Sequence, residues 1–171
     1  MNIVNPQTAL VSLSDKSNLN HIIDFLVKKK IKILSTGGTY NAIKEITDNV
    51  LEVSEFTGFD EMMDGRVKTL HPKIHAGILA RRDSDLELLE EKGYETIDLV
   101  IVNLYPFEET IKKDCSFEDA IENIDIGGPT MIRAAAKNFQ DVVVLSDPND
   151  YEKITREWDL NDGISYETRK N

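Results

Sequence analysis

The chain has 171 residues, of which 40% are hydrophobic, so it can form one domain with a substantial buried core. It carries 31 acidic and 20 basic side chains, which give a formal net charge of -11. Its overall field repels polyanions, and we expect neither nucleic acid nor a membrane as a partner. A small phosphorylated ligand is still compatible, because a few local cations and backbone N–H groups can hold one phosphate.

Cysteine content and the first residues indicate a compartment. The single cysteine, Cys115, cannot form an intrachain disulfide, and MNIVNPQ has neither a basic nor an apolar signal region. The apolar runs at 99–102 and 142–145 are too short to cross a bilayer. We therefore expect a reduced, cytoplasmic protein.

Short β-branched runs alternate with amphipathic stretches along the chain. The expected strands are 8–13, 31–35, 50–54, 76–81, 98–104 and 142–146, and the expected helices are 17–29, 39–46, 84–92, 117–124, 129–138 and 149–158. This alternation predicts an α/β fold of three layers, α/β/α, with a mainly parallel sheet. We expect one domain over 1–158 and a polar linker over 159–171.

Ligands of open α/β sheets bind beyond the carboxyl ends of the strands. Two of the expected strands are followed there by small hydroxyl and glycine residues, one group with a lysine and the other leading into a helix, which suits a phosphate. A tight turn with Thr39 as a helix cap is the alternative, but two such loops after adjacent strands favour binding. The candidate residues are Ser12, Ser14, Lys16, Thr36, Gly37, Gly38 and Thr39.

The segment 64–77 concentrates cations, a hydroxyl and two imidazoles that no hydrophobic period explains. Arg66 and Lys68 lie on the same side of an extended chain, where both could meet one anionic group. His71 and His75 raise the possibility of a metal site, but Pro72 opposes a regular helix that carries both. We favour hydrogen-bonding roles for the imidazoles and predict no metal site.

Two further segments place polar groups near the same edge. Asn103 and Tyr105 follow a strand, and Asp125 precedes a Gly-Gly turn whose N–H groups suit a developing oxyanion. Lys137 lies two to three turns further along that helix, and taken alone it is more typical of a solvated helix end than of a catalyst.

Together, the segments SLSDK, STGGT, GRVKTLHPKIHAGIL, NLYPF and DIGGPTMIRAAAKN resemble the IMP cyclohydrolase domain of the bifunctional AICAR transformylase/IMP cyclohydrolase family, from about Ala9 to Trp158. The resemblance implies a methylglyoxal-synthase-like fold. It also implies closure of the formylated aminoimidazole carboxamide ribonucleotide FAICAR to inosine monophosphate (IMP), with loss of water and without a cofactor. A transformylase domain, which would use 10-formyltetrahydrofolate, is absent from this sequence.

The resemblance also assigns site residues. It places Ser12, Ser14, Lys16 and Thr36 to Thr39 (Thr36, Gly37, Gly38, Thr39) at the phosphate and ribose, and it adds to the nucleotide site Arg66, Lys68, Thr69, Val102, Asn103, Asp125, Ile126 and Gly127. It implies that Lys137 transfers protons and that Lys68 stabilises the transition state. Tyr105 and Asp125 would support the geometry, and a homodimer would be the assembly.

Two other functions are compatible with this fold. A regulatory nucleotide-binding module needs the phosphate loops but not Lys68, Tyr105, Asp125 and Lys137 together. A methylglyoxal synthase would use a carboxylate base on a triose phosphate, and the segments GRVKTLHP and RAAAKN argue against it. We therefore expect an enzyme.

Overall fold

A five-stranded parallel sheet forms the centre of the computed structural model, which describes residues 2–105, 107 and 116–171. The strands are β2 (Thr8–Leu13), β3 (Lys32–Ser35), β4 (Leu51–Glu52), β5 (Leu99–Asn103) and β6 (Val143–Leu145), in the order β4-β3-β2-β5-β6. Their apolar, β-branched sequences suit strands that are covered on both faces. Cys115 lies outside the described residues.

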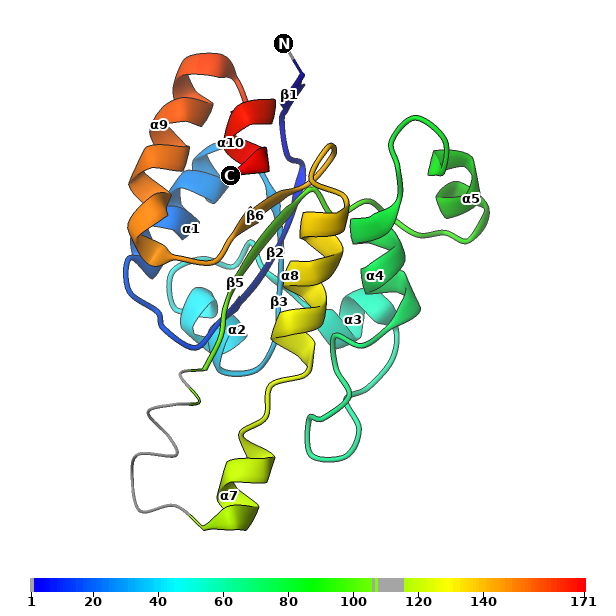
Figure 1. Ribbon diagram of the computed structural model, residues 1–171, viewed down its shortest axis with the longest axis vertical. Coiled ribbons are helices and arrows are strands. Elements are labelled where there is room, and N and C mark those ends of the chain that lie inside the picture. The colour runs from blue at the N-terminus through cyan, green and yellow to red at the C-terminus, as the bar shows by residue number, and fades with distance from the viewer. Residues whose placement is uncertain (1, 106, 108–115) are drawn as a thin grey trace.

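Helices cover both faces of this sheet and complete the three layers (Figure 1). On one face, α1 (Leu19–Lys28), α2 (Gly37–Lys44) and α9 (Tyr151–Asn161) pack with the alternate residues Ala9, Val11, Leu99 and Ile101. On the other, α3 (Val53–Thr57), α4 (Pro72–Leu79) and α8 (Gly127–Lys137) pack with Leu10, Leu34, Val100 and Val102. The period of two along each strand thus divides the core into two halves, and the expected fold class is confirmed.

Other short helical elements of the described residues lie outside these layers. They include α5 (Leu86–Glu91), α7 (Phe117–Glu122) and the 3-10 turn η1 (Pro148–Asp150). The Ser116 hydroxyl and the Asp119 carboxylate form a capping box at the start of α7. Figure 1 shows α7 beyond the carboxyl ends of the strands, which brings it near the candidate site.

Two strand predictions need correction. Residues 76–81 were expected to form a strand, but Pro72–Leu79 is the helix α4, which is capped by His71 and buries Ile74, Gly77 and Ile78. A short apolar run fits either a strand or a buried helix, and the preceding proline was the decisive signal. Of the expected strand 50–54, only Leu51–Glu52 pairs, because the Glu52 carboxylate caps the helix α3 that starts at Val53.

The last residues fold back onto the domain, although 159–171 was expected to be a linker. Strand β7 (Ile164–Ser165) pairs antiparallel with β1 (Ile3–Val4), and α10 (Tyr166–Lys170) follows. Arg169 is buried, and its guanidinium donates hydrogen bonds to the carbonyls of Phe139 and Gln140. The folded unit therefore extends beyond the expected boundary at residue 158.

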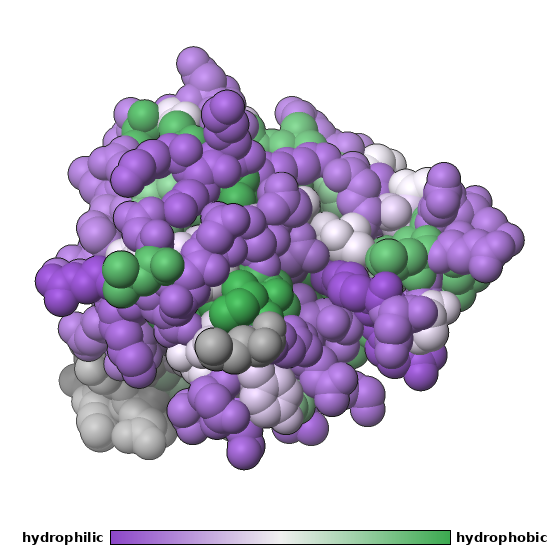
Figure 2. Space-filling view, turned by 90° about the horizontal axis from the view of Figure 1, so that it is seen from above, coloured by the Kyte–Doolittle hydropathy of each residue, from purple (hydrophilic) through white to green (hydrophobic). Residues whose placement is uncertain are grey.

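The surface at the end that carries both termini is mainly polar, with apolar side chains in small separate patches (Figure 2). None of the described helices is long and apolar enough to span a membrane. The opposite end, where the parallel strands terminate, carries the polar loops that were singled out in the sequence.

Candidate active site

A cleft of about 650 Å³ opens beyond the carboxyl ends of the strands. The chain runs from β2 through β3 to β4 on one side of the sheet and then returns to β5 and β6 on the other. Strands β2 and β5 therefore flank the point where the strand order reverses, which is where open α/β sheets bind ligands. The volume is that of a small-molecule site.

The loop after β2 is fastened to the end of β5. Asn103 Oδ1 accepts hydrogen bonds from the backbone N–H groups of Ser14 (2.8 Å) and Asp15 (2.9 Å), and its Nδ2 donates to the Asp15 carbonyl (2.7 Å). Lys16 follows in the same loop, lines the cleft and donates a hydrogen bond to the Leu13 carbonyl at 3.2 Å. The loop thus presents a cation from a fixed backbone.

The loop after β3 becomes the first turn of α2. Thr36 is extended, and Gly37 takes a left-handed conformation with φ 58° and starts the helix. The first N–H groups of a helix have no partner within it, and Gly37, Gly38 and Thr39 line the cleft. The buried Thr39 hydroxyl accepts from the Leu13 N–H (2.9 Å) and donates to the Leu13 carbonyl (3.0 Å). Thr39 therefore joins the two loops rather than capping the helix, and the helix start is available to an anion.

A tight hairpin carries Arg66 into the cleft. Met62 and Val67 exchange two backbone hydrogen bonds of 3.1 and 3.2 Å, and Met63, Asp64 and Gly65 are all left-handed between them. Such a conformation costs about 1–2 kcal/mol for a residue other than glycine. Arg66 pairs with Glu122 of α7, and this hydrogen bond lowers the pKa of Glu122 and raises the pKa of Arg66.

Lys68 lies between the hairpin and the start of α2. Its ammonium is 2.7 Å from the Glu61 carboxylate, and a side chain on Gly37 would meet Lys68 Nζ at 3.6 Å. Lys68 is half-buried, whereas Lys16 is exposed. The ammonium and the N–H groups of α2 thus bring two sources of positive potential to one point of the cleft.

The start of α8 closes the other side. Asp125 Oδ1 accepts a hydrogen bond of 2.9 Å from the Gly128 N–H, which fixes the carboxylate at the helix start. A Cβ on Gly127 would approach the hydroxyl of the buried Thr69 to 2.7 Å. Only a glycine allows this contact, so the Gly-Gly pair explains how the two segments meet.

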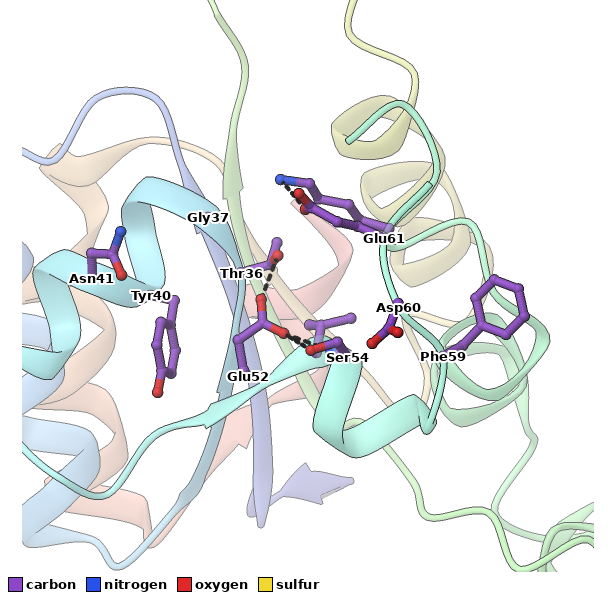
Figure 3. Close-up of a pocket in the computed structure, with 11 residues that line it drawn as sticks. Thr36, Gly37, Tyr40, Asn41, Glu52, Ser54, Phe59, Asp60 and Glu61 are labelled. Carbon is purple, nitrogen blue, oxygen red and sulfur yellow. Dashed lines mark hydrogen bonds and ion pairs between the residues drawn. The ribbon is translucent and has the colours of Figure 1, made fainter. Parts of the chain in front are cut away.

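A second cleft of about 520 Å³ adjoins the first and shares Thr36, Gly37 and Lys68 with it. Figure 3 shows Glu61 extending toward Gly37 and Thr36, while Phe59 points away. Burial opposes the ionisation of Glu52 in this cleft. The hydrogen bonds from Ser54 and Thr36 and the charge of Lys68 outweigh burial and lower the pKa of Glu52.

The structure brings most of the predicted residues together and leaves others outside. The larger cleft is lined by Ser12, Lys16, Thr36, Gly37, Gly38, Thr39, Arg66, Lys68, Thr69, Asp125, Ile126 and Gly127. Its lining does not include Ser14, Val102, Asn103, Tyr105 and Lys137. Val102 is fully buried, and Tyr105, two residues after the end of β5, is 48% exposed. The Asn103 amide forms hydrogen bonds with the neighbouring loop.

Lys137 lies at the far end of the helix whose start forms the cleft. It is exposed and is the last residue of α8, ten residues after Gly127. A rise of 1.5 Å per residue places it about 15 Å further along the helix axis. Within one chain the structure therefore does not bring Lys137 to the cleft.

Other lining residues were missed in the sequence. They include Ile121, Glu122 and Ile124 from α7 and the segment after it, together with Gly128 and Met131 of α8. Gly128 and Met131 belong to a quoted motif, but Glu122 lies on a short amphipathic helix and nothing in its spacing indicates a site. Its place in the cleft depends on tertiary packing.

His71 and His75 belong to the start of α4. His71 Nδ1 accepts a hydrogen bond from the Lys73 N–H at 3.1 Å and caps α4, and His75 lies one turn into that helix. Among residues 2–105, 107 and 116–171, no three His, Cys, Asp or Glu side chains are grouped as metal ligands.

A parallel sheet with a polar cleft at its switch point is typical of α/β domains that bind small molecules. The chain matches the model of the MGS-like domain over residues 18–130, and it belongs to that family. Residues 135–171 match the model of the AICARFT/IMPCHase bienzyme. Both matches confirm the resemblance seen in the sequence.

Individual relatives agree with this assignment. The bifunctional purine biosynthesis proteins PurH of Fusobacterium nucleatum subsp. nucleatum and Clostridium beijerinckii are 57% and 56% identical over 164 residues, or 95% of this chain. The chain spans about a third of their length, 32% and 33%. The crystal structure of ForH matches 96% of this chain and 87% of its own, with a TM-score of 0.82 and 33% identity.

Proposed function

We propose that this chain is an IMP cyclohydrolase, which closes FAICAR to IMP with loss of water. The observation that supports it best is the convergence of Lys68, Thr69 and the Asp125–Gly128 turn in one cleft beside a helix start. The similarity to the PurH proteins over 95% of the chain supports the same reaction.

The cleft suits both ends of such a nucleotide. The start of α2 and Lys16 would bind the phosphate, because N–H groups and an ammonium favour a dianion. The base would then lie toward Asp125 and Gly127. This orientation holds the carboxamide nitrogen near the formyl carbon, so that the two groups react within one bound molecule.

The chemistry requires charge stabilisation and proton transfer. The carboxamide nitrogen forms a bond to the formyl carbon, and the formyl oxygen gains negative charge, collects protons and leaves as water. Lys68 lines the same cleft and would stabilise the oxyanion, while Asp125 would orient the attacking amide. No metal, redox group or folate takes part in this step.

The role of Lys137 is a separate part of the proposal. A proton transfer by Lys137 would have to reach the cleft from the other end of α8 or from a second copy of the chain. A cytoplasmic homodimer that acts on a small nucleotide fits the resemblance, and sedimentation of the purified chain at several concentrations would test the dimer.

An ultraviolet assay tests the proposal. Purified chain is mixed with FAICAR, and formation of IMP is compared with the uncatalysed cyclisation. Acceleration that disappears in Lys68→Met supports a cyclohydrolase. Tight IMP binding without acceleration would instead identify a regulatory nucleotide-binding module.

A further inference from the structure

Glu61 contacts Lys68 at the point where the two clefts meet. Glu61 Oε2 lies 2.7 Å from Lys68 Nζ, and the side chains are 54% and 28% exposed, respectively. Glu61 lines only the smaller cleft, whereas Lys68 lines both. The carboxylate therefore contacts the ammonium from the smaller cleft, whereas Asp125 and the start of α8 line the larger one.

The hairpin backbone makes room for this ion pair. A Cβ on Gly65 would lie 2.6 Å from Lys68 Cε and 3.0 Å from Nζ, and 3.8 Å from Glu61 Oε2. Gly65 also has a φ of 86°, which is strained for other residues. The Lys68 side chain thus crosses the hairpin directly over a position without a side chain and reaches Glu61.

The other nearby carboxylate is already engaged. Glu52 accepts hydrogen bonds from the Thr36 hydroxyl at 2.9 Å and from the Ser54 N–H at 2.7 Å, and it also accepts one from the Ser54 hydroxyl. Lys68 influences Glu52 through its charge only. Within the described part of the chain, Glu61 is the carboxylate in ion-pair contact with Lys68.

We propose that Glu61 is a positioning residue for cyclisation, which holds the Lys68 ammonium at the junction of the clefts and so aims it at the reacting group. This inference rests on the proposed function. A lysine side chain has four flexible bonds, and ordering it in advance removes a cost that would otherwise fall on the transition state. Because the pair is partly exposed, its loss should affect catalysis more than folding.

The test uses Glu61→Gln, which keeps the shape and removes the charge, together with Lys68→Met and the double variant. We expect Glu61→Gln to lower kcat about tenfold and to change KM less than about twofold, because the ammonium acts in the transition state. In the Lys68→Met background Glu61→Gln should have no further effect. Glu61→Asp should recover part of the rate.

The matched control is Glu95→Gln, which breaks the surface pair of Lys32 and Glu95 at 2.8 Å. Neither residue lines the clefts, and we expect this variant to retain the wild-type rate. An unchanged kcat in Glu61→Gln, or an equal loss with and without Lys68, would overturn the proposal.

A second readout separates this inference from the proposed function. The nitrogen-15 NMR signal of the Lys68 ammonium, assigned by its loss in Lys68→Met, should be observable in the wild type. Glu61→Gln should broaden it through faster exchange with water. If the wild-type chain does not convert FAICAR, the proposed function fails. The signal still decides whether Glu61 holds Lys68, since an identical signal in Glu61→Gln refutes that contact.

Discussion

The carboxamide of Asn103 forms two hydrogen bonds with the backbone of Asp15. It accepts one from the Asp15 N–H at 2.9 Å and donates one to the Asp15 carbonyl at 2.7 Å. The side chain at the end of β5 thus continues the pairing of β2 and β5 beyond the last paired residues, Leu13 and Asn103. It fixes the loop that carries Lys16 at the point where the strand order reverses.

Asn103→Ala removes these hydrogen bonds and leaves the N–H groups of Ser14 and Asp15 without their partner. We expect a loss of about 1–3 kcal/mol in the free energy of unfolding, measured by urea denaturation, and weaker IMP binding. Asn49→Ala is the control, because Asn49 donates one hydrogen bond to the Ile31 carbonyl away from the cleft. Equal IMP affinity in both variants would show that the hydrogen bonds of Asn103 do not shape the site.

Lys16→Ala tests the phosphate end of the cleft. We expect the affinity for IMP, measured by calorimetry, to fall about tenfold, while the affinity for inosine, which has no phosphate, stays the same. Lys44→Ala is the control, because Lys44 is at the end of α2 and pairs with Asp48 at 2.9 Å. A similar loss for IMP and inosine would contradict phosphate binding by Lys16.

Gly127→Ala tests the contact between the start of α8 and Thr69. The added methyl group would lie 2.7 Å from Thr69 Oγ1, so one of the two segments must move. We expect a fall in kcat/KM of about tenfold or more, since catalytic groups tolerate little displacement. Thr69→Ala in the same chain would remove the clash, and failure of the double variant to improve on Gly127→Ala would indicate a different cause.

The buried Tyr151 gives the protein a titration at high pH. Burial, assisted by the charges of Asp15 and Asp147, raises the pKa of Tyr151 from 10.0 to about 12. Between these values the folded protein keeps a proton that the unfolded chain has lost, so the stabilisation present below pH 10 is lost as the pH rises to about 12. Urea unfolding of wild type and Tyr151→Phe should show a smaller fall over this interval in the variant. Parallel curves would contradict the shift.

The sequence predicted the sheet and the loops better than the short helices. The strands around Leu10, Leu34 and Val100 are short apolar runs, and the structure confirms them. The prediction of a strand over 76–81 was wrong, because the apolar run of α4 is equally compatible with a strand. The polar sequence of the terminal segment predicts a linker, because nothing in it indicates that Arg169 is buried.

The sequence predicted those residues of the candidate site that belong to compact motifs. Thr36, Lys68 and Asp125 stand in compact motifs that follow strands or precede a helix, and the structure brings all three to one cleft. Glu61 and Glu122 come from segments without such a motif, and their positions depend on how the hairpin and α7 pack. Lys137 belongs to the same motif as Asp125, but the helix α8 lies between them and places Lys137 away from the cleft.

The first measurement to make is the rate of IMP formation from FAICAR by the purified chain, with Lys68→Met and Lys137→Ala in parallel. Lys68 lines the cleft and Lys137 lies about 15 Å along α8 from Gly127. We expect clear acceleration by the wild type, a loss of about 100-fold or more in Lys68→Met, and a smaller loss in Lys137→Ala. A wild-type rate equal to the uncatalysed cyclisation, or full activity of Lys68→Met, would contradict a cyclohydrolase site in this cleft.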